Sequence, residues 1–92
     1  MSYKVIFLLD AQKDIERLKK SGNKILLKKL DSLLEELKEH PTFGTGKPEQ
    51  LKHYEIPTWS RRISGEHRLV YRIQDELITV LVLSVYGHYN DK

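Results

Sequence analysis

Near the end of the chain stands the stretch Leu77-Ile78-Thr79-Val80-Leu81-Val82-Leu83-Ser84-Val85-Tyr86. Most of its residues are apolar and many are β-branched, with no regular alternation of polar side chains. A run of this kind is typical of a strand that is covered on both faces. The stretch therefore predicts the central strand of a sheet, around which the other elements must be arranged.

Two further strands are expected directly before this stretch. Residues 58–63 and 66–74 are separated by Ser64-Gly65, and the short turn Asp75-Glu76 leads into the central strand. Turns of this length join neighbouring antiparallel strands, because a parallel connection needs a long crossover. The last third of the chain therefore predicts a three-stranded antiparallel meander.

The first half of the chain predicts a strand and two helices. Residues 3–9 have the β-branched and aromatic composition of a strand. Asp10 is expected to cap a first helix that ends at Ser21-Gly22, and Asn23 to cap a second that ends at His40-Pro41. Leucines recur at helical spacing in the second helix and should form its buried stripe: Leu26, Leu30, Leu33 and Leu37.

Together these elements predict an α+β fold. It consists of an N-terminal strand, an antiparallel helical hairpin and a three-stranded antiparallel meander, joined by an irregular segment at residues 41–57. The helices must cover one face of the sheet to bury their apolar stripe, so the opposite face is available for function.

Composition limits the class of protein. The 92 residues, 39% hydrophobic and 32% charged, fit one compact soluble domain over 1–92. The absence of cysteine excludes disulfides, zinc–thiolate sites and thiol nucleophiles. No apolar run is long enough to span a bilayer and no signal peptide is recognisable, so we expect a cytoplasmic protein with no membrane partner.

Basic residues gather in two zones of the sequence. Residues 10–29 and 47–72 are predominantly basic, whereas residues 31–39 between them are predominantly acidic, and the formal net charge is +3. This distribution suggests a polyanionic partner such as nucleic acid. The alternative for the helical zone is an ordinary solvated helix face.

Strand periodicity places an arginine on the open face of the sheet. Alternate residues of 66–74 point to opposite faces. His67, Leu69, Tyr71 and Ile73 are assigned to the helix-covered core, and His67 is interpreted as a buried, hydrogen-bonded histidine. Arg68, Val70 and Arg72 are assigned to the other face, where packing does not require an arginine.

The partner of Arg68 depends on the length of the hairpin loop. A two-residue Ser64-Gly65 turn sets Arg61 opposite Arg68, whereas a loop one residue longer, with Gly65 left-handed, sets Arg62 there. In both arrangements two guanidinium groups converge, which is unfavourable unless an anion lies between them. Phosphate fits best, because arginine binds it through a planar, bidentate pair of donors.

The remaining polar residues suit cleavage of RNA without a metal. That reaction needs a base for the 2′-hydroxyl, cations for the charged transition state and an acid for the departing 5′-oxygen. Glu49, between Lys47 and Lys52, is a candidate base. His88 is a candidate acid, because histidine has an ordinary pKa of about 6.5. The scattered histidines predict no metal site and no cofactor. Trp59 is expected either to stack on bases or to pack in the core.

Three segments resemble the YoeB/Txe branch of the RelE toxin superfamily. They are Gly44-Thr45-Gly46-Lys47-Pro48-Glu49-Gln50-Leu51-Lys52-His53, the pair Trp59-Ser60-Arg61-Arg62-Ile63 and Glu66-His67-Arg68-Leu69-Val70-Tyr71, and the terminal Gly87-His88-Tyr89. The chain departs from the better-known members in carrying residues 90–92 after the His-Tyr pair. Tyr86 also stands where some members carry a basic residue.

The resemblance implies a fold, an activity and partners. It implies a microbial-ribonuclease-like sheet and a toxin that cleaves messenger RNA in the ribosomal A site. Glu49 is then the base, His88 the acid and Arg68 the residue that stabilises the transition state. Lys52 and Arg62 hold phosphate, and Tyr89 positions the substrate. The implied partners are ribosome-bound messenger RNA, ribosomal RNA and a YefM-like antitoxin, and a second copy of the chain is a further partner to consider.

A different class of function uses the same arginines. A non-catalytic toxin module that grips nucleic acid or protein needs the positive charge of Arg68 and its neighbours, but it needs neither a base nor an acid. The set of Glu49, Arg68 and His88 therefore distinguishes an enzyme from a binder.

Overall fold

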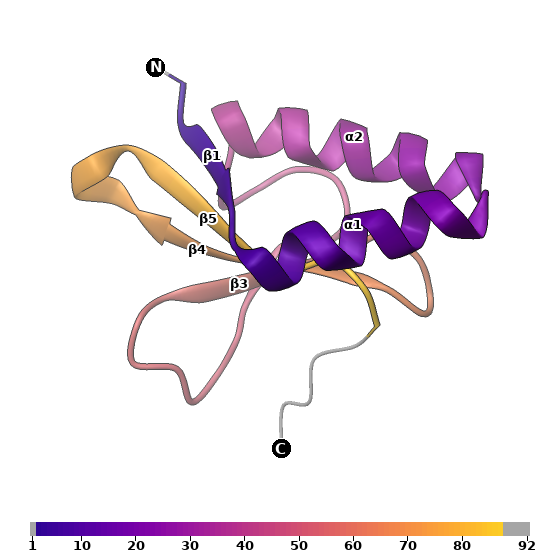
Figure 1. Ribbon diagram of the computed structural model, residues 1–92. Helices are drawn as coiled ribbons and strands as arrows, with labels where there is room; N and C mark the ends of the chain where they lie inside the picture. Colours follow the sequence, from indigo (N-terminus) through magenta and orange to yellow (C-terminus); the bar gives the residue numbers. More distant parts are fainter. Residues whose placement is uncertain (1, 88–92) are drawn as a thin grey trace.

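The computed structural model describes residues 2–87 and consists of two helices on one side of a five-stranded sheet (Figure 1). A short 3₁₀ helix, Asp75–Leu77, precedes the last strand. The elements in chain order are β1 (Lys4–Phe7), α1 (Leu9–Ser21), α2 (Lys24–Glu39), β2 (Glu49–Gln50), β3 (Thr58–Arg62), β4 (Arg68–Gln74) and β5 (Thr79–Ser84). The expected α+β architecture is confirmed.

The strands follow the order β1-β5-β4-β3-β2. The antiparallel meander of β3, β4 and β5 is confirmed, and β1 adds to β5 in parallel. β2 was not expected, because its two polar residues lie in a segment interpreted as irregular. It pairs antiparallel with β3, and Leu51 N donates to Thr58 O immediately beyond it. The sheet thus extends to the loop that carries Glu49.

The interior position of β5 agrees with its apolar sequence, but only one of its faces is fully covered. Val80 and Val82 are fully buried beneath the helices, whereas Leu81 and Leu83 on the strand are half-buried. The expectation of complete cover on both faces is therefore wrong. Helices cover one face of this sheet, and the face opposite them remains more open.

The ends of the helices follow the sequence signals with one exception. Gly22 ends α1 in the left-handed conformation, with φ +72°, and the Asn23 side chain accepts a hydrogen bond from Leu26 N at the start of α2. The predicted cap at Asp10 is wrong, because α1 begins at Leu9 and its N-cap, Leu8, makes no side-chain cap bond. Leu8 N still bonds to Val82 O of the sheet, so the chain passes from strand into helix before Asp10.

The leucine stripe of α2 forms the centre of the hydrophobic core. All four predicted leucines are buried and pack with Leu18 of α1 and with apolar side chains of β4 and β5. Neither helix in the described part of the chain has the length and apolarity required to cross a membrane.

We predict that Leu33→Ala lowers the free energy of unfolding by about 3 kcal/mol, since Leu33 is fully buried and truncation leaves a cavity. Urea denaturation measures this change. Ile25→Ala on the same helix is the matched control, because Ile25 is 85% exposed and should change stability by less than about 0.5 kcal/mol. Equal effects of the two substitutions would contradict the assignment of the buried face.

Candidate functional site

Arg68, Glu49 and Ser60 come together on the face of the sheet that the helices leave uncovered. Pairing of β2 with β3 sets Glu49 opposite Ser60, and Arg68 begins the neighbouring strand. Arg68 Nη1 lies 3.5 Å from Glu49 Oε1 and 3.4 Å from Ser60 Oγ. The arginine side chain is 18% exposed and the glutamate 53%, so a partly desolvated cation lies beside an accessible carboxylate.

The hairpin register places Arg62, not Arg61, opposite Arg68. This is the longer of the two loops considered, but Gly65 does not adopt the expected left-handed conformation. Instead the N–H groups of Ile63 and Ser64 both donate to His67 O. Ser64 Oγ accepts hydrogen bonds from the backbone N–H groups of Glu66 and His67. The serine side chain therefore closes the loop and removes the need for a positive φ.

Arg61 points to the opposite face, and its candidacy as a phosphate-binding residue is corrected by the structure. The side chain is fully buried. Its Nε donates to Tyr71 Oη at 3.2 Å, and Nη1 donates to Glu36 Oε1 at 2.9 Å. The other donors bind carbonyl oxygens of the connection between α2 and β2: His40, Phe43 and Thr45. All five N–H donors of the guanidinium are thus used within the protein.

Two glycines allow this connection to wrap around Arg61. Both have positive φ, +128° at Gly44 and +85° at Gly46. A Cβ on Gly44 would lie 2.2 Å from Glu36 Oε1, and one on Gly46 would lie 2.9 Å from Arg62 O. Arg62 N also donates to Gly46 O at 2.7 Å. The Gly-Thr-Gly segment therefore serves a structural purpose, and it delivers the chain to Glu49 three residues later.

The Arg61 cluster shifts the ionisation of its neighbours. Glu36 accepts a hydrogen bond from Thr45 N at 2.8 Å. Hydrogen bonding by the Thr45 side chain, then by its backbone N–H and by Arg61, outweighs burial and holds the pKa of the Glu36 carboxyl below its ordinary value. Burial raises the pKa of Tyr71, whose hydroxyl donates to Pro41 O at 2.7 Å. The connection after α2 is therefore fastened by one buried cation, one carboxylate and one phenol.

The end of the described chain also approaches Arg68. Arg68 N donates to Gly87 O at 3.0 Å, so the residue that precedes His88 is hydrogen-bonded to the start of β4. His88 and Tyr89 themselves lie outside the described residues. Lys52 is exposed two residues beyond β2, on the same connection as Glu49.

Sequence reasoning missed two polar residues that shape this region. Ser60 is fully buried beside Arg68, and Glu36 holds Arg61. The alternation of β3 could have identified Ser60, since it shares a face with Arg62, whereas nothing local in the sequence marks Glu36. Trp59 is partly buried against the core cluster, which favours packing over base stacking.

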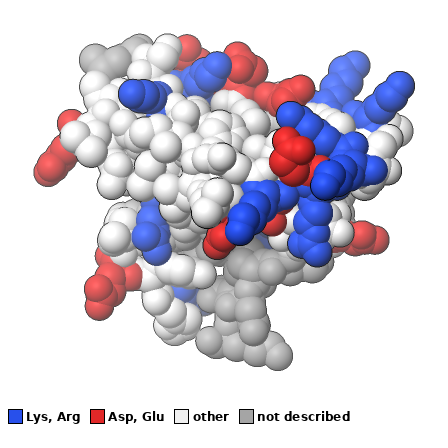
Figure 2. Space-filling model, viewed as in Figure 1, with Lys and Arg blue, Asp and Glu red and all other residues white. Residues whose placement is uncertain are grey.

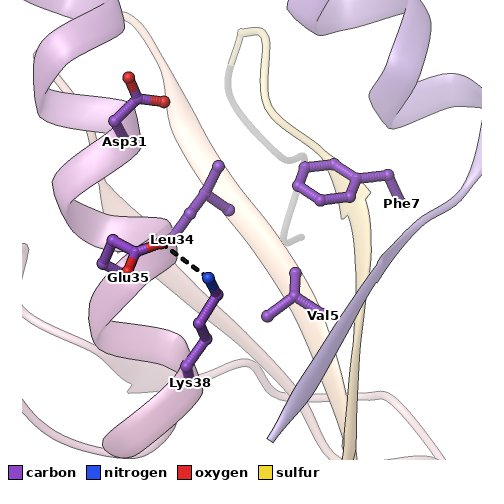
Figure 3. Close-up of a pocket in the computed structure, with 6 residues that line it drawn as sticks. All are labelled: Val5, Phe7, Asp31, Leu34, Glu35 and Lys38. Carbon is purple, nitrogen blue, oxygen red and sulfur yellow. Dashed lines mark hydrogen bonds and ion pairs between the residues drawn. The ribbon is translucent and has the colours of Figure 1, made fainter.

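A separate groove lies away from these residues. It has a volume of about 520 Å³ and separates β1 from α2 (Figure 3). Val5, Phe7 and Leu34 give it apolar walls, and Glu35 forms an ion pair with Lys38 at its rim. It contains none of the candidate site residues. Among residues 2–87, no cluster of three or more histidine and acidic side chains is arranged to hold a metal.

Basic side chains gather over the end of the helical hairpin where α1 and α2 meet (Figure 2). The basic residues of residues 10–29 all lie on the two helices and are exposed with the exception of half-buried Lys29: Lys13, Arg17, Lys19, Lys20, Lys24, Lys28 and Lys29. The basic zone at residues 10–29 is thus a surface of the folded protein.

A family model for the YoeB-like toxin of bacterial type II toxin–antitoxin systems matches residues 7–89 of the chain. Toxin YoeB of Escherichia coli (strain K12) is 42% identical over 67 residues, which cover 73% of this chain and 77% of that protein.

Solved structures of similar proteins agree in fold. A YoeB/ParE toxin from Agrobacterium tumefaciens superposes with a TM-score of 0.85 at 34% identity, covering 94% of this chain and 99% of its own. YoeB from Staphylococcus aureus, solved as a dimer, gives a TM-score of 0.82 at 32% identity, covering 97% and 100%. A YoeB–YefM complex from the same organism gives 0.78 at 33% identity with the same coverage.

We predict that Glu36→Gln destabilises the protein at neutral pH by about 1.5 kcal/mol, because Arg61 loses a hydrogen bond to a charged acceptor. A carboxyl whose pKa is lowered by folding stabilises the protein above its unfolded pKa of about 4.3. That contribution disappears as the pH falls through the folded value. The difference between wild type and variant should therefore be full at pH 7 and narrow below about pH 4.

Urea denaturation across this pH range measures the difference. Glu35→Gln is the control, because Glu35 is 72% exposed and forms a surface ion pair with Lys38. It should change stability little at any pH. A Glu36→Gln effect that stays constant from neutral to acid pH would show that the charge of Glu36 is not what stabilises Arg61.

Proposed function

The chain belongs to the family of YoeB-like toxins of bacterial type II toxin–antitoxin systems, and we propose that it is an endoribonuclease that cleaves messenger RNA in the ribosomal A site. The observation that carries the proposal is the approach of Arg68 to Glu49 on the open face of the sheet. A carboxylate and a guanidinium at this distance supply a base and a charge-stabilising group to one phosphodiester.

In the proposed reaction Glu49 removes the proton of the 2′-hydroxyl, whose oxygen attacks the adjacent phosphorus. Arg68 stabilises the negative charge that accumulates on the phosphoryl oxygens, and His88 donates a proton to the departing 5′-oxygen. The products are a 2′,3′-cyclic phosphate and a 5′-hydroxyl. Proton transfer by the two side chains makes a metal ion unnecessary for either step.

The surroundings of Arg68 suit this role. Its guanidinium is mostly buried, and a charge in such a place interacts more strongly with a developing anion than one in open water. Ser60 orients it from β3. Arg62, directly opposite on β3 and exposed, and Lys52 are proposed to hold the flanking phosphates, and Tyr89 to position the substrate.

We further propose that the protein acts in the cytoplasm and that the basic end of the helical hairpin contacts ribosomal RNA. The basic side chains gathered there give this surface a charge opposite to that of a phosphate backbone. Binding of this kind holds the enzyme in register and carries no sequence information.

The partners of its relatives suggest partners for this chain. The Staphylococcus aureus toxin has been solved both as a dimer and in a YoeB–YefM complex. We propose that a YefM-like antitoxin binds and neutralises this protein, and that the free toxin forms a homodimer.

We predict that Arg68→Ala slows cleavage of ribosome-held messenger by about 100- to 1000-fold, the usual effect of removing a group that stabilises the transition state. His88→Gln should abolish cleavage while ribosome binding stays nearly intact. Primer extension on messenger in programmed ribosomes measures cleavage, and sedimentation measures binding.

Arg72→Ala is the matched control, since Arg72 lies on the same strand and face but pairs with Thr58, away from Glu49. It should cleave at close to the wild-type rate. Wild-type protein that binds ribosomes and blocks translation without cutting messenger would support the alternative, a non-catalytic binding toxin. Equal cleavage of free and ribosome-held RNA would refute ribosome dependence.

We also predict that the triple substitution of Lys19, Lys20 and Lys24 by glutamate weakens ribosome binding. The slope of the logarithm of the binding constant against the logarithm of salt concentration should become shallower by about one for each lysine that contacts phosphate. Replacing the same lysines by arginine retains the charge and should leave binding close to wild type. Unchanged affinity and salt dependence in the glutamate variant would show that this surface does not contact RNA.

A further inference from the structure

The three residues before His88 are held by side chains of other elements. Asp14 of α1 accepts hydrogen bonds from Val85 N at 3.0 Å and Tyr86 N at 3.3 Å through the same oxygen, Oδ2. Gly87 N donates to His67 Nδ1 at 2.8 Å. The backbone N–H groups of residues 85–87 therefore find their acceptors in two side chains.

The ring of Tyr86 is clamped at the same point. Its centroid lies 4.4 Å from that of the His67 ring, and the Arg17 guanidinium carbon lies 4.2 Å from it. Tyr86 is 38% exposed, so these contacts add little to the hydrophobic core. Their effect is to fix the direction of the chain at residues 86–87.

Gly87 connects this clamp to the candidate site. Its N–H donates to the side chain of His67, and its carbonyl accepts a hydrogen bond from the backbone N–H of Arg68, the residue that follows His67. Gly87 has φ +77°, a conformation that glycine adopts without strain. Gly87, the residue that precedes the proposed acid, is thus fixed relative to Arg68.

We propose that His67 and Asp14 are positioning residues that hold the chain so that His88 can protonate the leaving 5′-oxygen beside Arg68. His67 acts as a hydrogen-bond acceptor, with its ring proton on Nε2 and its Nδ1 free of a proton. This inference rests on the proposed function. It gives His67 a role in aligning the acid. The strand pattern predicted a buried core histidine at this position, whereas His67 is half-buried.

Two substitutions of His67 distinguish the effect of its hydrogen-bond acceptor, Nδ1, from the effect of its aromatic ring. His67→Phe keeps an aromatic ring against Tyr86 and loses the acceptor, whereas His67→Asn loses the ring and keeps an oxygen close to the position of Nδ1. We expect the phenylalanine variant to lower the single-turnover rate of cleavage by about 10- to 100-fold, the effect of a misplaced catalytic group. Its half-saturating ribosome concentration should be unchanged. The asparagine variant should stay within about threefold of wild type.

A change of leaving group tests whether His67 acts through the acid. A messenger with sulfur in place of the bridging 5′-oxygen releases a thiolate, which needs no proton because its pKa is far below that of an alcohol. On this substrate His67→Phe should cleave as fast as wild type, and His88→Gln should recover with it. Arg68→Ala should remain slow, since it acts on the phosphoryl oxygens.

Thermal melting checks that each variant is folded. If His67→Phe does not fold, the cleavage rates of Asp14→Ala, which lacks the acceptor, and Asp14→Asn, which keeps one, are compared instead. Equal losses in His67→Phe and His67→Asn overturn the inference, and so does a His67→Phe defect of the same size on the sulfur substrate. Wild-type protein that fails to cleave either messenger on the ribosome instead overturns the proposed function. The two failures are therefore distinguished.

Discussion

The buried guanidinium of Arg61 is the constraint on which the functional half of the molecule depends. A cation removed from water is costly unless all its donors are satisfied, and here the acceptors come from Tyr71, Glu36 and three loop carbonyls. A segment that supplies three carbonyl oxygens to one planar guanidinium has little conformational freedom left. The connection between α2 and β2 is therefore ordered without a core of its own, because a single charge organises it. A lysine would not replace Arg61, since an ammonium offers three donors and no planar fork.

The consequences extend from Arg61 to the candidate site through the backbone. Gly44 and Gly46 are required where the loop passes the guanidinium and β3, since a Cβ on either meets another atom at less than 3 Å. From Gly46 the chain is hydrogen-bonded to Arg62 and then becomes β2, which sets Glu49 beside Ser60 and Arg68. The carboxylate on the open face is thus positioned by an interaction on the covered face, one residue away along β3. Adjacent arginines in one strand serve opposite purposes because their side chains point in opposite directions.

Local patterns predicted much of this fold. Leucines at helical spacing gave the hairpin and its buried face, Asn23 and Gly22 gave two helix ends, and short turns gave the meander. The failures are equally physical. Asp10 is a good cap by type, but the last β1–β5 hydrogen bond determines where the helix begins. β2 has no apolar alternation, since its two residues pair at the sheet edge. Either arginine could have faced Arg68, because that choice depends on the side chain of Ser64, which no propensity encodes.

The partners of His67 illustrate the same limit at the candidate site. Period-2 geometry assigned it to the core face, although the residue lies just before β4 and is only half-buried. There it contacts Tyr86 and Gly87, some twenty residues later in the chain, and Tyr86 in turn contacts Arg17 and Asp14, which lie at least fifty residues before His67. Such a junction exists only once the sheet and α1 are assembled. Arg61 fixes the loop that carries Glu49, whereas His67 and Asp14 fix the strand end that leads to His88. The two reacting ends of the proposed site are therefore held by separate polar clusters, and Arg68 lies between them with its side chain directed to Glu49 and its backbone to Gly87.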